Sequence, residues 1–455
     1  MVQVSEPWLG DAPTDWRRSR IRNVARLSPG TSGLPPKSDE DCTVVPMERV
    51  SDDGKIDVRF AQAFEDISSG LTLFEVGDVL FAKITPCMEN GKGAFVESLP
   101  TKYALGSTEF HVLRPSPGVH AKYLYYYTFN PTYRAYAAEN MSGAAGQKRV
   151  SSRFVKDTRL FLPPLRQQER IAAYLDASCA AIDAAMAAKR RQVETLEAAR
   201  ESLIERTVTR GVRGDGKMRT IDEEWLTKIP IHWQACRVKR IVFSVDYGIS
   251  QRTEPAGRYA VLKMGHIQRG EITFRNLDFV DTVPEHLLLD NGDLLFNRTN
   301  SPDQVGKAAI FRRSKREQVT FASYLVRLRT NHRADPRYLN YLVNCAGFLS
   351  FARKLAIPSV QQSNLNSTRY CRLVVPRPPL QEQTEIADFL DERTAELSRI
   401  AANVEAQIAT LTAYRKSLIH ECVTGQRRIS EADLRAITGR AATVVANTAH
   451  EPTHA

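Results

Sequence analysis

The chain lacks the patterns from which metal sites, disulfide frameworks and membrane spans are usually inferred. Its seven cysteines include no C-x-x-C pair, and its nine histidines include no H-E-x-x-H sequence. We therefore expect neither a zinc site nor a disulfide framework. No stretch approaches eighteen consecutive apolar residues and the N-terminal segment has no apolar run, so the sequence predicts no membrane span and no signal peptide. Together these absences predict a cytoplasmic protein in a reducing compartment.

Signatures of catalysis are also missing. The sequence contains no G-x-x-x-x-G-K-[ST] phosphate loop and no nuclease-like set of paired carboxylates with a lysine. Asn130-Pro131-Thr132-Tyr133 is similar to the Asn-Pro-Pro-Tyr box of adenine-N6 methyltransferases, but it lacks the second proline and follows a tyrosine-rich helical run. No glycine-rich cofactor loop lies near it. We predict a chain that is not an enzyme and that binds no cofactor and no metal itself.

What the chain has in excess is positive charge. It carries 63 Lys and Arg against 52 Asp and Glu, which gives a net charge of +11. Such an excess favours a polyanionic partner, because basic side chains release the counterions that surround nucleic acid. Hydrophobic residues make up 42% of the 455 residues, so the chain can form roughly two to four domains with cores of their own.

The sequence contains a long internal repeat. Pro163-Pro164-Leu165 recurs as Pro378-Pro379-Leu380, 215 positions later, and residues 163–209 align with 378–424 without a gap, with about two positions in five identical. Each half is therefore a variable globular region followed by a shared segment, as a duplication would produce. The predicted division is two globular domains, two helical spacers and a loose, flexible tail: 1–160 and 214–376, 161–213 and 377–428, and 429–455.

Both shared segments have the composition of long helices. About 45 residues without Gly or Pro follow each Pro-Pro-Leu, and apolar residues recur every seven positions, which is typical of a coiled-coil seam. The residues expected to pair the helices are Leu175, Ile182, Leu196, Leu203, Leu390, Leu397, Val404, Leu411 and Leu418. Because a globular region separates the two segments, an antiparallel pair buries both apolar stripes most simply. The alternative is that each helix packs on its own domain.

Short β-rich runs and helical stretches are mixed in the globular regions. Residues 79–82, 110–113 and 325–328 have the composition of strands, and residues 121–129 and 336–344 have that of helices. The sequence therefore predicts an α+β fold, with two α/β-type domains separated by two long helices in a pseudo-two-fold tandem repeat.

Two polar loops stand out in each half. They are rich in Arg, Lys, Asn and Gln, the side chains that make bidentate contacts with base edges. The candidate DNA contacts of the first half are Lys83, Thr85, Asn90, Lys92, Gln147, Lys148 and Arg149. Those of the second half are Asn297, Arg298, Thr299, Asn300, Lys307, Gln361, Gln362 and Asn364. The alternative is that these are ordinary polar surface loops.

The layout resembles the specificity subunit of type I restriction–modification systems. The resemblance rests on the segments around the two Pro-Pro-Leu motifs, on Ser202-Leu203-Ile204 and Val208-Thr209, and on the Trp-Leu…Pro…Trp stretches that open each half. It implies that the globular regions are target-recognition domains, each of which reads one half of a bipartite, asymmetric site in double-stranded DNA. It also implies modification subunits, expected to be two, that carry S-adenosylmethionine and methylate adenine, and restriction/translocase subunits that use ATP and Mg. No membrane is among the expected partners.

Two other functions stay open at this point. One is a self-sufficient DNA adenine methyltransferase, which binding of S-adenosylmethionine by the isolated chain would favour. The other is a coiled-coil scaffold without a role on DNA, which failure of the chain to bind duplex DNA at moderate salt would favour.

Overall fold

The computed structural model describes residues 9–10, 13–29, 41–63, 71–144, 146–214, 216–312, 318–359 and 362–448. The chain divides into two compact units. Unit 1 comprises residues 1–189 and 406–455, and unit 2 comprises residues 190–405. Each of the two long helices therefore contributes one part to each unit, whereas the sequence-based division treats each helix as a separate spacer.

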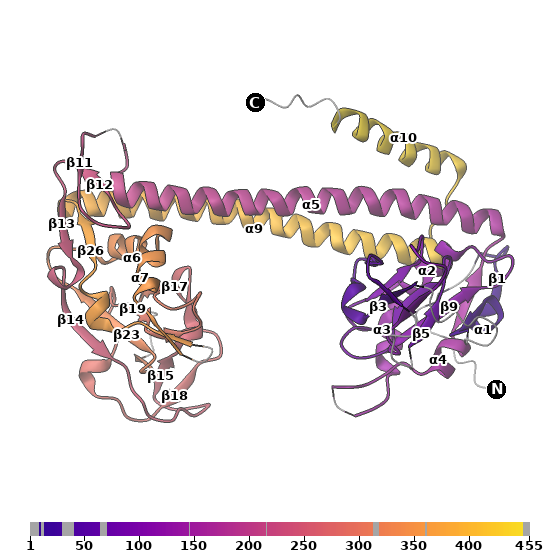
Figure 1. Ribbon diagram of the computed structural model, residues 1–455, viewed down its shortest axis with the longest axis horizontal. Coiled ribbons are helices and arrows are strands. Elements are labelled where there is room, and N and C mark those ends of the chain that lie inside the picture. Colours follow the sequence, from indigo (N-terminus) through magenta and orange to yellow (C-terminus); the bar gives the residue numbers. More distant parts are fainter. Residues whose placement is uncertain are drawn as a thin grey trace. The chain divides into compact units, whose positions relative to one another are not determined.

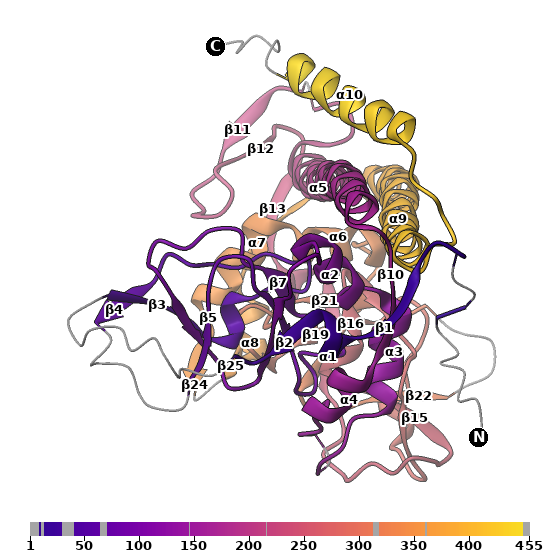
Figure 2. The ribbon, with the colours of Figure 1, turned by 90° about the vertical axis from the view of Figure 1, so that its right-hand side faces the viewer.

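Unit 1 contains two four-stranded sheets among its described residues (Figures 1 and 2). The first has the order β2 (Ala25–Leu27), β9 (Phe110–Pro115), β6 (Val79–Ala82), β7 (Gly93–Phe95). The second has the order β4 (Ala61–Ala63), β3 (Asp41–Val45), β8 (Ala104–Gly106), β5 (Thr72–Phe74). A separate antiparallel pair is β1 (Arg17–Arg20) with β10 (Arg159–Leu162). The short helices are α1 (Ile21–Val24), α2 (Ala121–Thr128), α3 (Pro131–Glu139), α4 (Ser152–Asp157) and the 3-10 turn η1 (Met47–Arg49).

Unit 2 has a six-stranded sheet with the order β14 (Val242–Tyr247), β23 (Leu325–Thr330), β19 (Leu294–Asn297), β21 (Ala308–Ile310), β17 (Gly270–Ile272), β16 (Ile267–Gln268). Its three-stranded sheets are β18 (Asp278–Val280), β15 (Tyr259–Leu262), β22 (Val319–Phe321), and β20 (Thr299–Asn300), β25 (Gln362–Asn364), β24 (Ile357–Ser359). Two-stranded pairs are β11 (Met218–Thr220) with β12 (Lys228–Pro230), and β13 (Gln234–Arg237) with β26 (Val374–Arg377). The helices are α6 (Pro336–Asn344), α7 (Ala346–Lys354) and α8 (Ser367–Tyr370), with 3-10 turns η3 (Val238–Arg240), η4 (Met264–His266) and η5 (Glu285–Leu287).

The two units repeat one fold. Strands β6, β7, β8, β9 and β10 begin 215 positions before β19, β21, β22, β23 and β26, and helices α2 and α3 begin 215 positions before α6 and α7. The strands and helices expected at 79–82, 110–113, 325–328, 121–129 and 336–344 are all present. The predicted α+β class and tandem repeat are therefore confirmed.

Equivalent polar contacts hold equivalent elements together. Arg114 donates from Nε and Nη2 to the two carboxylate oxygens of Asp78, at 2.9 and 2.8 Å. Arg329 does the same to Asp293, at 2.8 and 3.1 Å. Both carboxylates are almost fully buried, so a bidentate arginine partner compensates for the loss of their hydration.

The long helices are α5 (Leu165–Arg210) and α9 (Leu380–Thr424), of 46 and 45 residues (Figure 1). Each begins after a Pro-Pro pair, and each is followed by a glycine with positive φ, Gly211 (84°) or Gly425 (79°). A left-handed residue at this position ends a helix, and glycine adopts it without steric cost.

The helices pair antiparallel within each unit. In unit 1 the core contains Leu175 and Ile182 from the first part of α5, and Leu418 and Cys422 from the last part of α9. In unit 2 the core contains Ile204 and Val208 from the end of α5, together with Ile386, Ala387 and Leu390 from the start of α9. The start of each helix thus packs with the end of the other.

Burial along the predicted seam is uneven. Of the nine expected pairing residues, the buried ones are Leu175, Ile182, Leu390, Val404 and Leu418. The partly exposed ones are Leu196, Leu203, Leu397 and Leu411. By length and composition alone, helix α5 could cross a membrane. The expectation of no membrane span rested on the absence of a long uninterrupted apolar run, which this helix also lacks. Its buried residues in unit 1 face a protein core instead, as Leu175 and Ile182 show.

The segment after Arg428 differs from the loose tail that composition suggested. Residues Glu431–Thr448 form helix α10. The Ser430 hydroxyl and the Asp433 carboxylate exchange hydrogen bonds with each other's backbone N–H, at 3.2 and 2.8 Å, which caps the first turn. Leu434 and Ile437 pack against the unit 1 core. Alanine-rich composition, which carries no apolar periodicity, is itself favourable for a helix.

Candidate nucleic-acid interface

In unit 2 the two polar loops singled out in the second half lie side by side. Strand β20 pairs with β25, so Thr299 and Asn364, 65 positions apart, face each other in register. The Asn364 side-chain amide donates to the Thr299 hydroxyl at 3.2 Å. The backbone N–H of Leu365 donates to the carbonyl of Arg298 at 2.8 Å. The two loops therefore form one surface.

The equivalent loops of unit 1 meet in the same way. Ile84 and Arg149 form an antiparallel bridge. The backbone N–H of Thr85 donates to the Lys148 carbonyl at 3.0 Å, and that of Val150 donates to the Lys83 carbonyl at 2.8 Å. Each unit thus brings both of its polar loops together, an adjacency that the sequence interpretation did not include.

Several predicted contacts in unit 1 are already engaged within the protein. Arg149 forms an ion pair with Glu109, Nη2 to Oε1 at 2.8 Å, and its hydrogen bonds lower the pKa of the Glu109 carboxyl. The Lys92 ammonium donates to the Met47 carbonyl at 3.1 Å. The predicted residues that are exposed are Asn90, Gln147 and Lys148. Those that are partly buried are Lys83, Thr85, Lys92 and Arg149.

In unit 2 one predicted contact is wrong on geometric grounds. Asn297 is the last residue of β19 and only 1% exposed, so its side chain does not reach a ligand at the surface. The apolar run of this strand ends at Phe296, so the sequence pattern placed Asn297 in the following loop, whereas the strand includes it. The Lys307 ammonium donates to Gln304 Oε1 at 2.8 Å. Gln361 lies outside the described residues. The remaining predicted residues, Arg298, Thr299, Asn300, Gln362 and Asn364, are at least partly exposed.

The structure adds apolar groups that sequence reasoning missed. Tyr247, Tyr324 and Ile357 are 44%, 47% and 54% exposed. Ile357 pairs with Asn364 in the small sheet, and the Tyr324 carbonyl accepts the backbone N–H of Arg298 at 3.0 Å. The Arg298 guanidinium carbon lies 5.1 Å from the centre of the Tyr247 ring. Only the fold reveals these residues, because large apolar side chains next to or within strands are more often buried than exposed.

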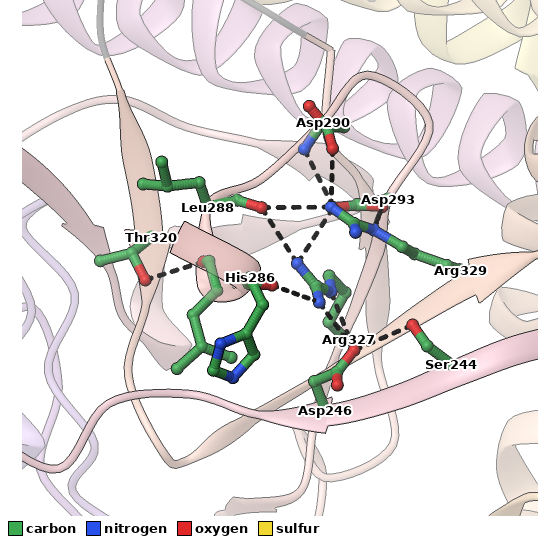
Figure 3. Close-up of polar contacts among 10 residues, drawn as sticks. Ser244, Asp246, His286, Leu288, Asp290, Asp293, Thr320, Arg327 and Arg329 are labelled. Atoms are coloured by element: carbon green, nitrogen blue, oxygen red, sulfur yellow. Dashed lines mark hydrogen bonds and ion pairs between the residues drawn. The ribbon is translucent and has the colours of Figure 1, made fainter. Parts of the chain in front are cut away.

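A buried arginine fixes the strand that carries Tyr247. Arg327, 2% exposed in β23, donates to the Asp246 carboxylate at 2.7 Å and to the carbonyls of His286 and Leu288 at 2.8 and 3.0 Å (Figure 3). Arg329 binds Asp293 beside it. These bonds link β14, β23 and the η5 turn, and they leave little freedom for the end of β14.

Unit 2 contains a cavity of about 850 Å³. Its acidic lining residues are Glu197, Glu201, Glu271, Asp303 and Asp391. Its basic ones are Arg200, Arg269, Lys307 and Arg353. A lining with this many carboxylates does not suit a polyanion, and Lys307 is the one predicted DNA contact among its lining residues. The paired loops are therefore the better candidate interface.

The segment that is similar to a methyltransferase box has a structural role. Asn130 is the N-cap of α3, and its side-chain oxygen accepts hydrogen bonds from the N–H and hydroxyl of Thr132, at 3.1 and 2.8 Å. Asn130 itself is fully buried, and so is Tyr133. In the part of the chain that the structure describes, no three His, Cys, Asp or Glu side chains are placed to hold a metal ion.

The fold is a duplicated module that carries one pair of polar loops in each copy, and comparison with known proteins identifies its family. The model of the type I restriction modification DNA specificity domain matches residues 13–195 and 247–410, one stretch in each half of the repeat. The chain belongs to this family. The family model describes a DNA specificity domain, and it matches this chain twice.

Curated relatives are specificity subunits of type I restriction enzymes. The chain is 33% identical over 164 residues to the EcoAI subunit of Escherichia coli, which is 35% of this chain and 27% of that protein. The match to the EcoEI subunit likewise covers only 27% of its length. The EcoKI subunit of Escherichia coli K12 is 23% identical over 345 residues, which is 74% of this chain and 71% of that one.

Solved structures share the fold. A chain from a structure concerned with complex assembly and conformational transition of the type I R-M system has a TM-score of 0.71 at 16% identity, and covers 91% of this chain and 98% of its own. The HsdS subunit from Thermoanaerobacter tengcongensis has a TM-score of 0.51 at 16% identity, and covers 93% and 100%. At this identity the likeness shows the fold alone.

Proposed function

We propose that each unit reads one half of a bipartite, asymmetric DNA site. The proposal rests on one observation: both units pair their two polar loops in the same way, but the side chains at equivalent loop positions differ. At the 215-residue offset, Lys83 corresponds to Arg298, Thr85 to Asn300 and Arg149 to Asn364. Because the frames are alike and the exposed groups differ, the two surfaces suit two different base sequences.

The test is an exchange of recognition domains in the complete complex. Residues 1–160 are replaced by the equivalent region of another family member, and the methylated sequence is mapped across the host genome. We expect one half of the recognised sequence to change and the other half to persist. A matched exchange of residues 214–376 should change the opposite half. An exchange that alters both halves together argues against one half-site per unit.

We also propose that the chain acts as the docking platform of a larger enzyme. The tandem repeat gives equivalent surfaces twice, which suits two modification subunits that supply S-adenosylmethionine and adenine methylation. Restriction/translocase subunits would add ATP- and Mg-dependent steps, and the assembly would work in the cytoplasm. Native mass spectrometry of the co-expressed subunits tests the stoichiometry, and a complex with one modification subunit per chain contradicts it.

The scaffold alternative makes a different prediction for the chain and its complex. DNA binding that depends on charge weakens steeply as salt rises. We expect the complex to bind duplex DNA with a strong salt dependence and with a preference for its own site. A complex that assembles but shows no affinity for duplex DNA at moderate salt favours a scaffold.

A further inference from the structure

We propose that Arg298 reads a guanine in the half-site recognised by unit 2, through a guanidinium group that Tyr247 holds in position. The inference rests on the proposed function and deepens it. It names the base and the reading group at one point of the interface, together with a positioning residue outside the loops predicted from sequence.

Arg298 is held through its backbone on both sides and through one ring contact of its side chain. Its backbone N–H donates to the Tyr324 carbonyl at 3.0 Å and its carbonyl accepts from Leu365 at 2.8 Å. Its guanidinium carbon lies 5.1 Å from the centre of the Tyr247 ring. A flat guanidinium over an aromatic face is a favourable arrangement, and it fixes the plane in which the N–H groups point.

Tyr247 is itself fixed. Its hydroxyl lies 2.6 Å from the Ser367 hydroxyl, at the start of α8. The preceding residue, Asp246, accepts a hydrogen bond from the buried Arg327 at 2.7 Å (Figure 3). Strand β14 continues in register with β23 as far as Tyr247, which faces Val326. The ring is thus part of the folded frame and not a freely moving side chain.

Among the described residues, no acceptor is bonded to the guanidinium of Arg298. Within the described part of the chain its side chain has no carboxylate partner, and its Nε is buried without an acceptor. By contrast, the loop arginine of unit 1, Arg149, which corresponds to Asn364 and not to Arg298, has its charge balanced by Glu109, with Nη2 at 2.8 Å from Oε1. The buried Nε does not reach a ligand, but Arg298 as a whole is partly exposed and no carboxylate neutralises it, which suits a ligand that supplies acceptors to its other N–H groups.

The surroundings favour a base edge over a phosphate. Arginine donates two parallel hydrogen bonds to O6 and N7 of guanine, and a fixed guanidinium plane is what that geometry requires. Beside Arg298 stand the amide of Asn364 and the exposed apolar groups of Tyr324 and Ile357. Amides read bases and apolar groups contact thymine methyls, whereas a phosphate site needs neither.

The experiment uses the complete complex with its modification subunits. The variants are Arg298→Ala, Arg298→Lys, Tyr247→Ala and Tyr247→Phe. Binding is measured by competition between the native site and a panel of duplexes in which each base pair of the unit 2 half-site is changed in turn, and methylated sequences are mapped in the host. A matched control is Arg258→Ala, since Arg258 also lies 5.1 Å from a tyrosine ring, that of Tyr259, but is exposed.

Arg298→Ala should lose discrimination at one G·C pair, by roughly 5- to 150-fold, and leave the other positions unchanged. Arg298→Lys should also lose it, because lysine keeps the charge but not the fork. Tyr247→Ala should weaken discrimination at the same pair, and Tyr247→Phe, which keeps the ring, should retain most of it. Arg258→Ala should behave like the unaltered protein.

Three results overturn the inference. In the first, both Arg298 variants fold, as thermal unfolding shows, and discriminate at every position as before. In the second, binding weakens equally for all sequences and its salt dependence decreases, which identifies a phosphate contact. In the third, discrimination is lost at a pair other than G·C. If the unaltered complex shows no sequence preference, the proposed function itself fails, which is a separate outcome.

Discussion

The hydroxyl of Tyr338 donates a hydrogen bond to the carbonyl of Val208, near the end of α5, at 3.1 Å. The equivalent hydroxyl of Tyr123 donates to the carbonyl of Val423, near the end of α9, at 3.2 Å. The same hydroxyl hydrogen is shared with a carbonyl in the strand before each tyrosine's own long helix, that of Pro376 or Phe161. The recognition fold of each half is therefore completed by the end of the other half's helix. Each unit therefore combines the globular region of one half of the sequence with a helix end from the other half.

This relationship predicts matched effects of Tyr123→Phe and Tyr338→Phe. Both hydroxyls are buried, and their removal leaves two carbonyls with fewer donors. We expect each substitution to lower the free energy of unfolding by about 1–2 kcal/mol, with the DNA sequence recognised left unchanged. Denaturant unfolding of the chain in complex measures the free energy of unfolding, and methylation mapping measures the DNA sequence recognised. If only one of the two variants is destabilised, the two contacts are not equivalent.

The fold could be predicted largely because the repeat makes each half evidence for the other. Leu175 and Leu390 lie on the same seven-residue stripe at the same offset, and both are fully buried. The Ser430-x-x-Asp433 spacing is a local signal for the start of helix α10, but the packing of Leu434 and Ile437 against a surface remote in sequence could not be predicted. The closing contacts of Tyr123 and Tyr338 also join residues 300 and 130 positions apart, which no local pattern reveals.

A second prediction concerns Arg327. The equivalent position in unit 1 is Val112, so Arg327→Val inserts a residue that the same fold already accepts there. It should nevertheless destabilise unit 2, by about 3 kcal/mol or more, because Asp246 and the carbonyls of His286 and Leu288 lose their donor. Thermal unfolding checks this, with Val112→Ile as a control for crowding at the matched site. Unchanged stability of Arg327→Val contradicts the view that the network fixes β14.

A third prediction concerns acid. His111 is 2% exposed, and burial lowers its pKa from 6.5 to about 4, although its Nε2 lies 2.9 Å from the Val150 carbonyl. Between pH 6.5 and 4 the unfolded chain takes up a proton that the folded chain does not, so stability falls as the pH falls through this window. The loss contributed by this group should reach about 3 kcal/mol near pH 4.

The repeat supplies the control, because the equivalent position in unit 2 is Val326. His111→Val should remove this contribution, so unfolding of unit 1 becomes less sensitive to pH between 6.5 and 4. His332→Gln, at an exposed site, should leave the pH dependence unchanged. Equal slopes for His111→Val and the unaltered chain show that His111 does not cause the acid sensitivity.

The candidate site was predictable in part. Polar composition at matched offsets was enough to single out both loops of each half. It could not show that they pair, since Thr85 and Lys148 meet only through a fold that brings residues 63 positions apart together. It also could not separate Arg298, without a carboxylate partner among the described residues, from Arg149, paired with Glu109. Whether a cation is available to a ligand depends on its neighbours in space and not on its neighbours in sequence.

The last prediction treats the paired helices as the ruler between the two half-sites. Helices α5 and α9 are uninterrupted and run antiparallel in each unit, so we propose that they set the number of unread base pairs. Inserting seven residues into each helix keeps the apolar stripe nearly aligned, with a drift of about 20°. It lengthens the helix pair by roughly 10 Å, equal to about three base pairs.

Because DNA twist also rotates the far half-site, the accepted spacer should lengthen by at most that amount, while both half-site sequences persist. Inserting four residues into one helix only moves its stripe out of register, and this control should destabilise the chain without a new spacer. Methylation mapping of the variants decides: an unchanged spacer in the stable seven-residue variant, or new half-site bases, shows that the helices are not the ruler.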